Sequence, residues 1–344
     1  MMSINTSLTR LLGVKTPVVA APMAGASGGA LAAQVTAAGA FGFTAAGYHS
    51  TENLINELSL SRGILQLAPS DPLPIGVGFL GWQLEKSTST AETMISAALD
   101  NHVQAIWFAF GNELGKWITY VRSRDASYQR IRPTTVFVQV SSIEEALVAI
   151  HEWKVDVLVA QGNESGGHGN GSAPPLLALV PAILAVLPPD GPLLLAAGGL
   201  MTGGQVASVL TLGADGAVLG TRFLMAPESQ YSGAQKKALV AAQNGATVRT
   251  MAFDRARGTL DWPPGIDGRG LYNSTVKDLD DGVDIETVRA KFNDGVRTGD
   301  PDRMLVWAGT GVGLVSEIKD AQAVVWELHK DIVEHLTTSI RILQ

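Results

Sequence analysis

The 344-residue sequence predicts an α/β protein, a closed (β/α)8 TIM barrel that carries an extended C-terminal excursion. The first observation behind this prediction is a series of short, nearly continuous apolar runs, the pattern of parallel strands covered on both faces. The second is that helical patterns lie between the runs, and eight such units favour a closed barrel over a doubly wound open sheet, the rival fold. The runs are Val18–Ala21, Gly42–Ala45, Ile75–Phe79, Ala105–Phe110, Thr135–Val140, Val155–Ala160, Leu193–Ala197 and Gly216–Leu219.

The helical patterns between the strands carry recognisable start and stop signals. The spacing of Ser142 and Glu145 predicts a capping box in front of an apolar helical face. Pro181 is expected to open a helix, because proline is favoured at the first helical position. Glycine follows two of the patterns as a C-terminal cap. The predicted segments are Ala30–Ala38, which ends at Gly39; the stretch after the capping box; Ala182–Leu187; and Gly204–Leu212, which ends at Gly213.

Residues 1–235 are predicted to form the barrel, and residues 236–344 an excursion and a helix that pack on it within the same overall domain. The stretch Gly245–Pro301 is polar. A long segment of this kind at one end of a barrel is either a functional element, such as a lid, or a surface loop without a role, and both readings stay open. The last helix is expected over Glu317–Leu336, with an apolar face against the outside of the barrel.

Composition excludes several classes of protein. There are no cysteines, so disulfides, thiolate nucleophiles and zinc–sulfur sites are excluded. The formal net charge is −7 without a dense Lys/Arg cluster, which argues against nucleic-acid binding. No apolar run reaches the roughly 18–20 residues of a membrane helix, and the first residues lack a secretory signal, so we expect a cytoplasmic protein; a weak organellar signal stays open.

The most informative stretch is the glycine-rich segment Ala160–Gly171, which follows the sixth predicted strand and contains His168. An imidazole on such a loop can transfer a proton near neutral pH, so His168 is the candidate catalytic residue. A structural histidine that donates to a carbonyl is the alternative. Asn163 or Glu164 is the candidate for a residue that orients the ring. His49, after the second strand, is the next candidate; the remaining histidines, His102, His151, His329 and His335, are expected to be solvated.

Paired glycine-containing turns follow the last two predicted strands. Gly198 and Gly199 follow the seventh strand, and Gly220 and Thr221 follow the eighth. Many barrels bind phosphate at these two loops, where backbone N–H groups converge on an anion and a following helix N-terminus adds its dipole. Thr221 adds a hydroxyl donor. Two tight βα turns without a ligand are the alternative reading.

Other strand ends carry residues suited to a flat ligand. Met23, next to Pro22 and Ala24, places a thioether where it can pack on an aromatic ring or cap the core. Gln139, at the end of the fifth strand, can hydrogen-bond the edge of a heterocycle. Tyr48, Trp82 and Trp107 are candidates for an apolar wall. The sequence shows no acidic pair, Ser/His/Asp arrangement or metal-ligand spacing, so no metal is expected.

At these motifs the chain resembles the nitronate monooxygenase family, formerly called 2-nitropropane dioxygenases. The resemblance runs along most of the chain and is specific for the superfamily. It is less specific for the substrate, because flavin-dependent enoyl-acyl-carrier-protein reductases and some NADH:quinone reductases share the barrel and many of the motifs. The motifs are Ala21–Gly25, Gly76–Phe79, Gln161–His168, Ala197–Leu200, Leu212–Gly216, Gly220–Phe223 and Trp307–Leu314.

The resemblance implies one non-covalent FMN in the barrel and no metal. His168 matches the family's catalytic histidine, the base for neutral nitroalkanes. The family often has Lys or another polar residue where Gln139 stands, so this contact departs from the pattern. The implied FMN contacts are Gly198, Gly199, Gly220 and Thr221 at the phosphate; Pro22, Met23, Ala24, Gly78 and Gln139 at the isoalloxazine; and Gly166 and Gly167 at the flavin edge.

The implied activity is the oxidation of alkyl nitronates, and of nitroalkanes once a proton is removed, by O2 to carbonyl compounds and nitrite. The expected partners are therefore a small-molecule substrate and O2, with no nucleic acid and no membrane, in a monomer or homodimer. Two alternatives stay open. One is an FMN-dependent NAD(P)H reductase of an enoyl thioester or quinone; the other is a non-catalytic barrel that binds a phosphate ligand, since a barrel alone does not determine function.

Overall fold

Eight parallel strands close into a barrel in the computed structural model, which describes residues 2–128 and 132–341. Their order around the barrel is the order along the chain, and the last strand pairs with the first. The predicted (β/α)8 fold is confirmed, with each strand within two residues of its predicted ends. The strands are β1 (Val18–Ala20), β2 (Phe41–Ala45), β3 (Leu73–Leu80), β4 (Val103–Ala109), β5 (Thr135–Val140), β6 (Val157–Gln161), β8 (Leu193–Ala197) and β9 (Gly216–Leu219).

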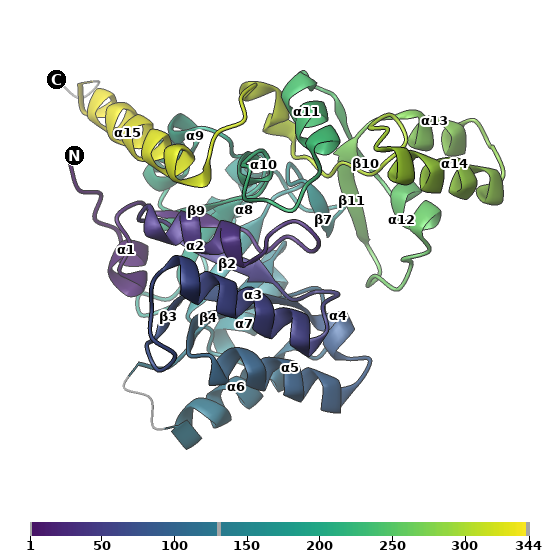
Figure 1. Cartoon of the computed structure of the whole chain (residues 1–344). Coiled ribbons are helices and arrows are strands. Elements are labelled where there is room, and N and C mark those ends of the chain that lie inside the picture. Colours follow the sequence, from purple (N-terminus) through teal and green to yellow (C-terminus); the bar gives the residue numbers. More distant parts are fainter. Residues whose placement is uncertain (1, 129–131, 342–344) are drawn as a thin grey trace.

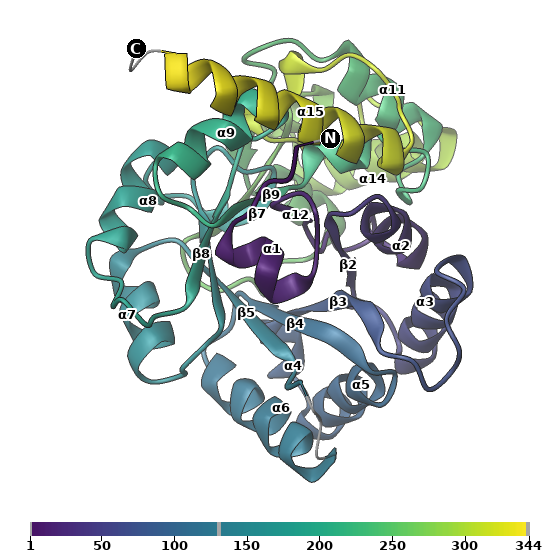
Figure 2. The same cartoon turned by 90° about the vertical axis from the view of Figure 1, so that its left-hand side faces the viewer.

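Helices surround the barrel, as the view along its axis shows (Figure 2). The last helix, α15, packs against both α2 and α9 and so completes the ring near the chain's two ends. The ring consists of α2 (Gly29–Ala37), α3 (Thr51–Ile64), α5 (Thr88–Asp100), α6 (Leu114–Tyr128), α7 (Ile143–His151), α8 (Leu176–Leu184), α9 (Gly203–Thr211) and α15 (Ala321–Ile340). The other helices of this part of the chain are α1 (Ser7–Leu12), α4 (Gly81–Leu84), α10 (Thr221–Leu224) and α11 (Gly233–Ala241).

Two helix predictions were wrong in their limits. Pro181 lies inside α8 rather than at its start. Leu176, Leu179 and Val180 precede it and are buried, and we infer that this burial outweighs the hydrogen bond that proline cannot donate. The last helix begins after Asp320, whose side chain accepts a hydrogen bond from the backbone N–H of Ala323.

The barrel interior is filled by aromatic and β-branched side chains. Phe137 is fully buried, stacks on Trp107 at a centroid distance of 5.9 Å and meets Phe43 edge-on at 5.1 Å. At the amino-terminal end, α1 covers the barrel, and its Leu8 and Leu12 belong to the interior cluster (Figure 2). The core therefore seals this end, and only the carboxyl ends of the strands remain for a site.

The excursion folds as a small unit with its own core (Figure 1). It contributes two strands to an antiparallel sheet with the order β10–β11–β7, in which β7 (Gly167–Asn170) comes from the predicted glycine-rich loop. Phe253, Val276, Val288 and Phe292 are buried within the unit. Its elements are β10 (Thr247–Thr250), α12 (Ala252–Arg257), β11 (Ile266–Leu271), α13 (Ser274–Asp280) and α14 (Ile285–Thr298); a 3-10 helix, η1 (Thr310–Leu314), follows.

One histidine prediction was wrong. His329 is buried rather than solvated, with 6% of its surface exposed. Its Nδ1 lies 2.9 Å from the Thr16 hydroxyl, and its Nε2 lies 2.9 Å from the carbonyl oxygen of Met2. The ring therefore ties α15 to the start of the chain. Within the described residues, no helix is long and apolar enough to cross a membrane.

Replacing Phe137 by alanine should lower the free energy of unfolding by about 3–5 kcal/mol, because it removes a fully buried ring and leaves a cavity between two aromatic neighbours. The measurement is urea unfolding followed by circular dichroism. Leu177→Ala is the control, since this side chain is 75% exposed and its loss should cost about 0.5 kcal/mol or less. Equal effects of the two changes would contradict the assignment of Phe137 to the core.

Candidate active site

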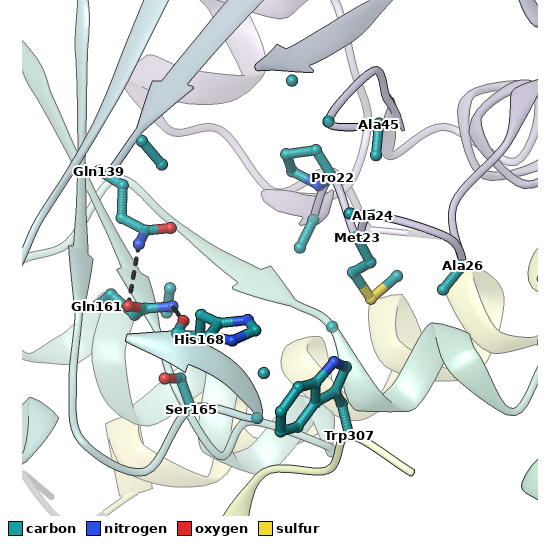
Figure 3. Close-up of a pocket in the computed structure, with 18 of the residues that line it drawn as sticks. Pro22, Met23, Ala24, Ala26, Ala45, Gln139, Gln161, Ser165, His168 and Trp307 are labelled. Carbon is teal, nitrogen blue, oxygen red and sulfur yellow. Dashed lines mark hydrogen bonds between the residues drawn. The ribbon is translucent and has the colours of Figure 1, made fainter. Parts of the chain in front are cut away.

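A cavity of about 1270 Å3, including solvent at its mouth, opens at the carboxyl ends of the barrel strands. Every site residue predicted from the sequence lines it: Pro22, Met23, Ala24, Gly78, Gln139, Gly166, Gly167, His168, Gly198, Gly199, Gly220 and Thr221. Figure 3 shows Pro22 and Met23 across an open space from Gln139 and Gln161, with His168 between Gln161 and Trp307. The fold therefore brings together residues from six barrel strands.

The turns after β8 and β9 form one wall of the cavity. Gly198 and Gly199 have φ angles of 142° and 64°, which residues with a side chain rarely adopt. A Cβ on Gly220 would meet nothing closer than the Met23 sulfur, at 3.5 Å, so this glycine leaves open space rather than avoiding a clash. The Thr221 hydroxyl accepts a hydrogen bond from the N–H of Gly309 at 2.9 Å, which leaves its own O–H free to donate.

The loop before β7 lies directly on a later segment of the chain. A Cβ on Gly166 would come within 2.5 Å of the backbone of Ala308 and Gly309, so only glycine allows this approach. Next to it, Ser165 is 6% exposed, lines the cavity, and has a buried hydroxyl oxygen without a hydrogen-bond partner among the described residues. An unsatisfied buried hydroxyl in a cavity wall is suited to a polar ligand.

Another part of the lining is apolar, and a pair of amides lies across the open space from it (Figure 3). A Cβ on Gly78 would lie 2.2 Å from the Pro22 ring, so the absence of a side chain lets Pro22 pack against β3. Gln139 donates through Nε2 to Gln161 Oε1 at 3.0 Å, and Gln161 donates to the His168 carbonyl oxygen at 3.2 Å. The side-chain oxygen of Gln139, Oε1, remains available as an acceptor at the cavity edge.

His168 lies on β7, opposite Gly268 of β11. Its Nε2 is 3.0 Å from each carboxylate oxygen of Asp254, on α12 of the excursion. The expectation that Asn163 or Glu164 orients the ring was wrong: Glu164 accepts the backbone N–H of Leu176 at the start of α8. The sequence offered no local signal for Asp254, which is 86 residues from His168 along the chain.

Two tryptophans hold the His168 ring. Trp262 stacks on it with centroids 3.6 Å apart and planes 15° from parallel, and Trp307 meets it at 4.9 Å and 67°. The hydroxyl of the buried Tyr231 accepts a hydrogen bond from the backbone N–H of Trp307 at 3.0 Å. Of the predicted apolar wall, Tyr48 and Trp107 line the cavity, whereas Trp82 lies behind it against Trp262.

Arg257, at the end of α12, is the one permanently charged side chain among the described residues that line the cavity. Its guanidinium makes no hydrogen bond or ion pair with another described residue. Burial raises the pKa of Tyr48 and of Tyr231, and in both cases the Arg257 charge acts in the opposite direction. Arg257 therefore adds a positive charge to the lining of the cavity.

Sequence reasoning missed the residues that the excursion and its continuation bring to the cavity. Arg257, Trp262 and Trp307 had no predicted role, although Trp262 lies in a Trp-Pro-Pro-Gly turn and Trp307 in a glycine-rich motif. Those turn signals mark a specific local structure but not its distance from His168. No group of three or more potential metal ligands occurs in the part of the chain that the structure describes.

Comparisons with known proteins identify the family of the chain. The sequence model of the nitronate monooxygenase family matches residues 5–77 and 79–331. The chain belongs to the nitronate monooxygenase family. It is 34% identical to "Nitronate monooxygenase npaC" of Metarhizium robertsii, over 95% of this chain and 93% of that one. It is 32% identical to a nitronate monooxygenase of Neurospora crassa, over 97% and 95%.

Solved structures extend the comparison of this family member. The nitroalkane oxidase of Streptomyces ansochromogenes has a TM-score of 0.77 and 28% identity, over 96% of this chain and 99% of that one. FabK from Thermotoga maritima has a TM-score of 0.76 at 24% identity, over 99% of each chain, which supports the fold alone.

Proposed function

We propose that this chain is an FMN-dependent enzyme that oxidises alkyl nitronates, and nitroalkanes after deprotonation, with O2 to carbonyl compounds and nitrite. The observation that carries the proposal is the imidazole of His168, which lines the same cavity as the glycine turns after β8 and β9. Membership of the nitronate monooxygenase family supports the reaction class. The small molecules involved are the substrate and O2, and we expect a cytoplasmic monomer or homodimer.

The residues present fit FMN. The backbone of Gly198, Gly199 and Gly220, with the Thr221 hydroxyl, would hold the phosphate, and the free Ser165 hydroxyl adds a nearby polar contact. Pro22, Met23, Ala24 and Gly78 form an apolar wall for the ring, Gln139 meets its edge, and Gly166 and Gly167 leave space beside it. When bound, the flavin supplies the electron transfer to and from substrate and O2.

His168 would act as the general base for a neutral nitroalkane. The hydrogen on the carbon beside a nitro group is acidic for a C–H, and a neutral imidazole within reach can remove it. Trp262 stacks on one face of the His168 ring and excludes water from that face. A preformed nitronate has already lost this proton and therefore does not need the base.

The charge of the cavity suits an anionic substrate. A nitronate carries a negative charge that the parent nitroalkane lacks. Arg257 faces the cavity, and no carboxylate side chain is among the described residues that line it. Attraction between this cation and the anion should increase the association rate of nitronates, and salt should weaken the effect.

The deciding experiment is to purify the protein, record its visible spectrum, and follow oxygen uptake with propionate 3-nitronate and alkyl nitronates. A flavin spectrum and oxygen uptake that depends on the nitronate would support the proposal. Rapid anaerobic bleaching of the flavin by NADH, without nitronate oxidation, would support the reductase alternative instead. A colourless protein that does not take up FMN would support a non-catalytic phosphate-binding barrel.

His168→Asn should lower kcat/KM for a neutral nitroalkane by about 10²–10⁴-fold, because the general base is lost. Oxidation of the preformed nitronate should stay within about tenfold, since no proton has to be removed. Oxygen uptake with both substrates, together with the flavin content of each preparation, measures the difference. Equal losses on the two substrates would refute the assignment of His168 as base.

Gly220→Ala should raise the dissociation constant of FMN by about tenfold or more, because the added methyl group enters the space where the phosphate would hydrogen-bond. The fold should tolerate alanine, since φ at Gly220 is −104°. Flavin fluorescence titration of the apoprotein measures affinity, and thermal unfolding checks stability. Gly233→Ala is the matched control, because its Cβ would meet nothing within 4 Å; unchanged FMN affinity in Gly220→Ala would count against phosphate binding at these turns.

Arg257→Met should lower kcat/KM for a nitronate by about fivefold, which corresponds to the roughly 1 kcal/mol that an exposed charge pair contributes. The kcat/KM for the neutral nitroalkane should change by less than about twofold. Rising salt should reduce the nitronate rate of the wild type more than that of the variant. Arg297→Met, which removes an exposed cation of the excursion, is the control. The same loss for both substrates would show that the charge of Arg257 does not select the anion.

A further inference from the structure

The contact between His168 and Asp254 has a geometry that distinguishes the two ring nitrogens. Nε2 is 3.0 Å from both carboxylate oxygens, and the Asp254 side chain has no exposed surface. Nδ1 makes no hydrogen bond with another described residue, and this atom is not fully buried. One nitrogen is therefore committed to a buried carboxylate, and the other is open to the cavity that His168 lines.

Asp254 is itself held in place by its own segment. The Thr259 hydroxyl donates to Asp254 Oδ1 at 2.8 Å, and the backbone carbonyl of Asp254 accepts the Thr259 N–H at 2.9 Å. Gly258, in the left-handed conformation with φ of 73°, turns the chain back so that this bond can form. A buried carboxylate needs such partners, because an unpaired buried charge is costly.

Other charged groups near β7 are directed elsewhere. Asp267 and Arg269 flank Gly268, the residue opposite His168, and alternation along a strand sends their side chains to the other face of the sheet. Arg249 bonds to Asp267 and to the carbonyl of Gly169 on that face, and Glu164 is bonded at the start of α8. Arg257 lines the cavity without a bond to the ring.

We propose that Asp254 is a positioning residue that keeps the proton of neutral His168 on Nε2, so that Nδ1 is the atom that accepts a proton from substrate. A carboxylate can only accept a hydrogen bond, so it selects the Nε2–H tautomer. When Nδ1 takes the substrate proton, the imidazolium lies beside the carboxylate and is stabilised by it. This inference rests on the proposed function for its substrate.

The proposal gives the excursion a defined part in the site. His168 comes from the strand that follows β6, and Asp254 comes from α12, so the competent base forms only when the excursion is folded against β7. The competing view is that Asp254 merely anchors the excursion. A structural anchor would stabilise the fold without determining which ring nitrogen carries the proton.

The direct test is to measure the imidazole ¹⁵N chemical shifts of the purified full-length enzyme near neutral pH, with the His168 signals assigned by their loss in His168→Asn. We expect protonated Nε2 and unprotonated Nδ1 in the neutral ring. Protonation on Nδ1, or an even mixture of tautomers, would overturn the proposal. This readout does not use substrate, so it stands even if the protein oxidises no nitronate.

Asp254→Asn should reverse the preference. Thr259 donates to Oδ1, so we expect the asparagine oxygen to stay there and its NH2 group to face Nε2, which favours the Nδ1–H tautomer. We expect kcat/KM for a neutral nitroalkane to fall by about 10²-fold or more, as for loss of a tautomer-fixing carboxylate, while the preformed nitronate stays within about threefold. Asp281→Asn, an exposed acid of the same unit, should change neither the tautomer nor either rate.

The two measurements separate the possible failures. An unchanged tautomer with equal losses on both substrates would reduce Asp254 to a structural anchor. A reversed tautomer in a protein that oxidises neither substrate would reject the proposed function but keep the role of Asp254. If Asp254→Asn does not fold, the tautomer of the wild type still decides, because a proton on Nδ1 is incompatible with the proposal.

Discussion

The pairing of β7 with β11 is the constraint on which the site depends. The barrel alone provides a ring of strand ends, but β7 lies outside that ring and forms an antiparallel ladder with the excursion, where His168 lies opposite Gly268. Because Gly268 has no side chain, Trp307 can pack against this position and reach the His168 ring. A single backbone ladder thus determines where the imidazole lies and which aromatic groups surround it.

The cavity divides its tasks between two parts of the chain. The barrel contributes the glycine turns and the apolar wall, which are properties of strand ends and resemble a site for a flat ligand with an anionic tail. The excursion contributes charge and aromatic contact through Asp254, Arg257 and Trp262. The backbone of Gly166, packed against Ala308 and Gly309, joins the two parts. Under the proposed function, changes in the excursion should alter proton transfer and substrate preference more than cofactor binding.

Local sequence signals were sufficient to predict the barrel strands and the glycine turns. The eight strands, the paired glycine turns and His168 were predicted from the sequence, and each has a local physical cause: continuous burial of parallel strands, backbone angles open to glycine, and an imidazole in a glycine-rich segment. The predicted limits of the helix around Pro181 were wrong. An apolar surface from Leu176 onward packs against the barrel, and local sequence rules do not include this tertiary contact.

The barrel and most of the residues that line the cavity are encoded in the sequence, because strand burial and turn geometry depend on short stretches of the chain. The partner of His168 is instead set by the tertiary structure. Asp254 is 86 residues away, and the strands that bring it near, Gly167–Asn170 and Ile266–Leu271, are rich in glycine and polar residues and lack a continuous apolar pattern. Their pairing depends on the packing of the whole excursion, so no local period could indicate it.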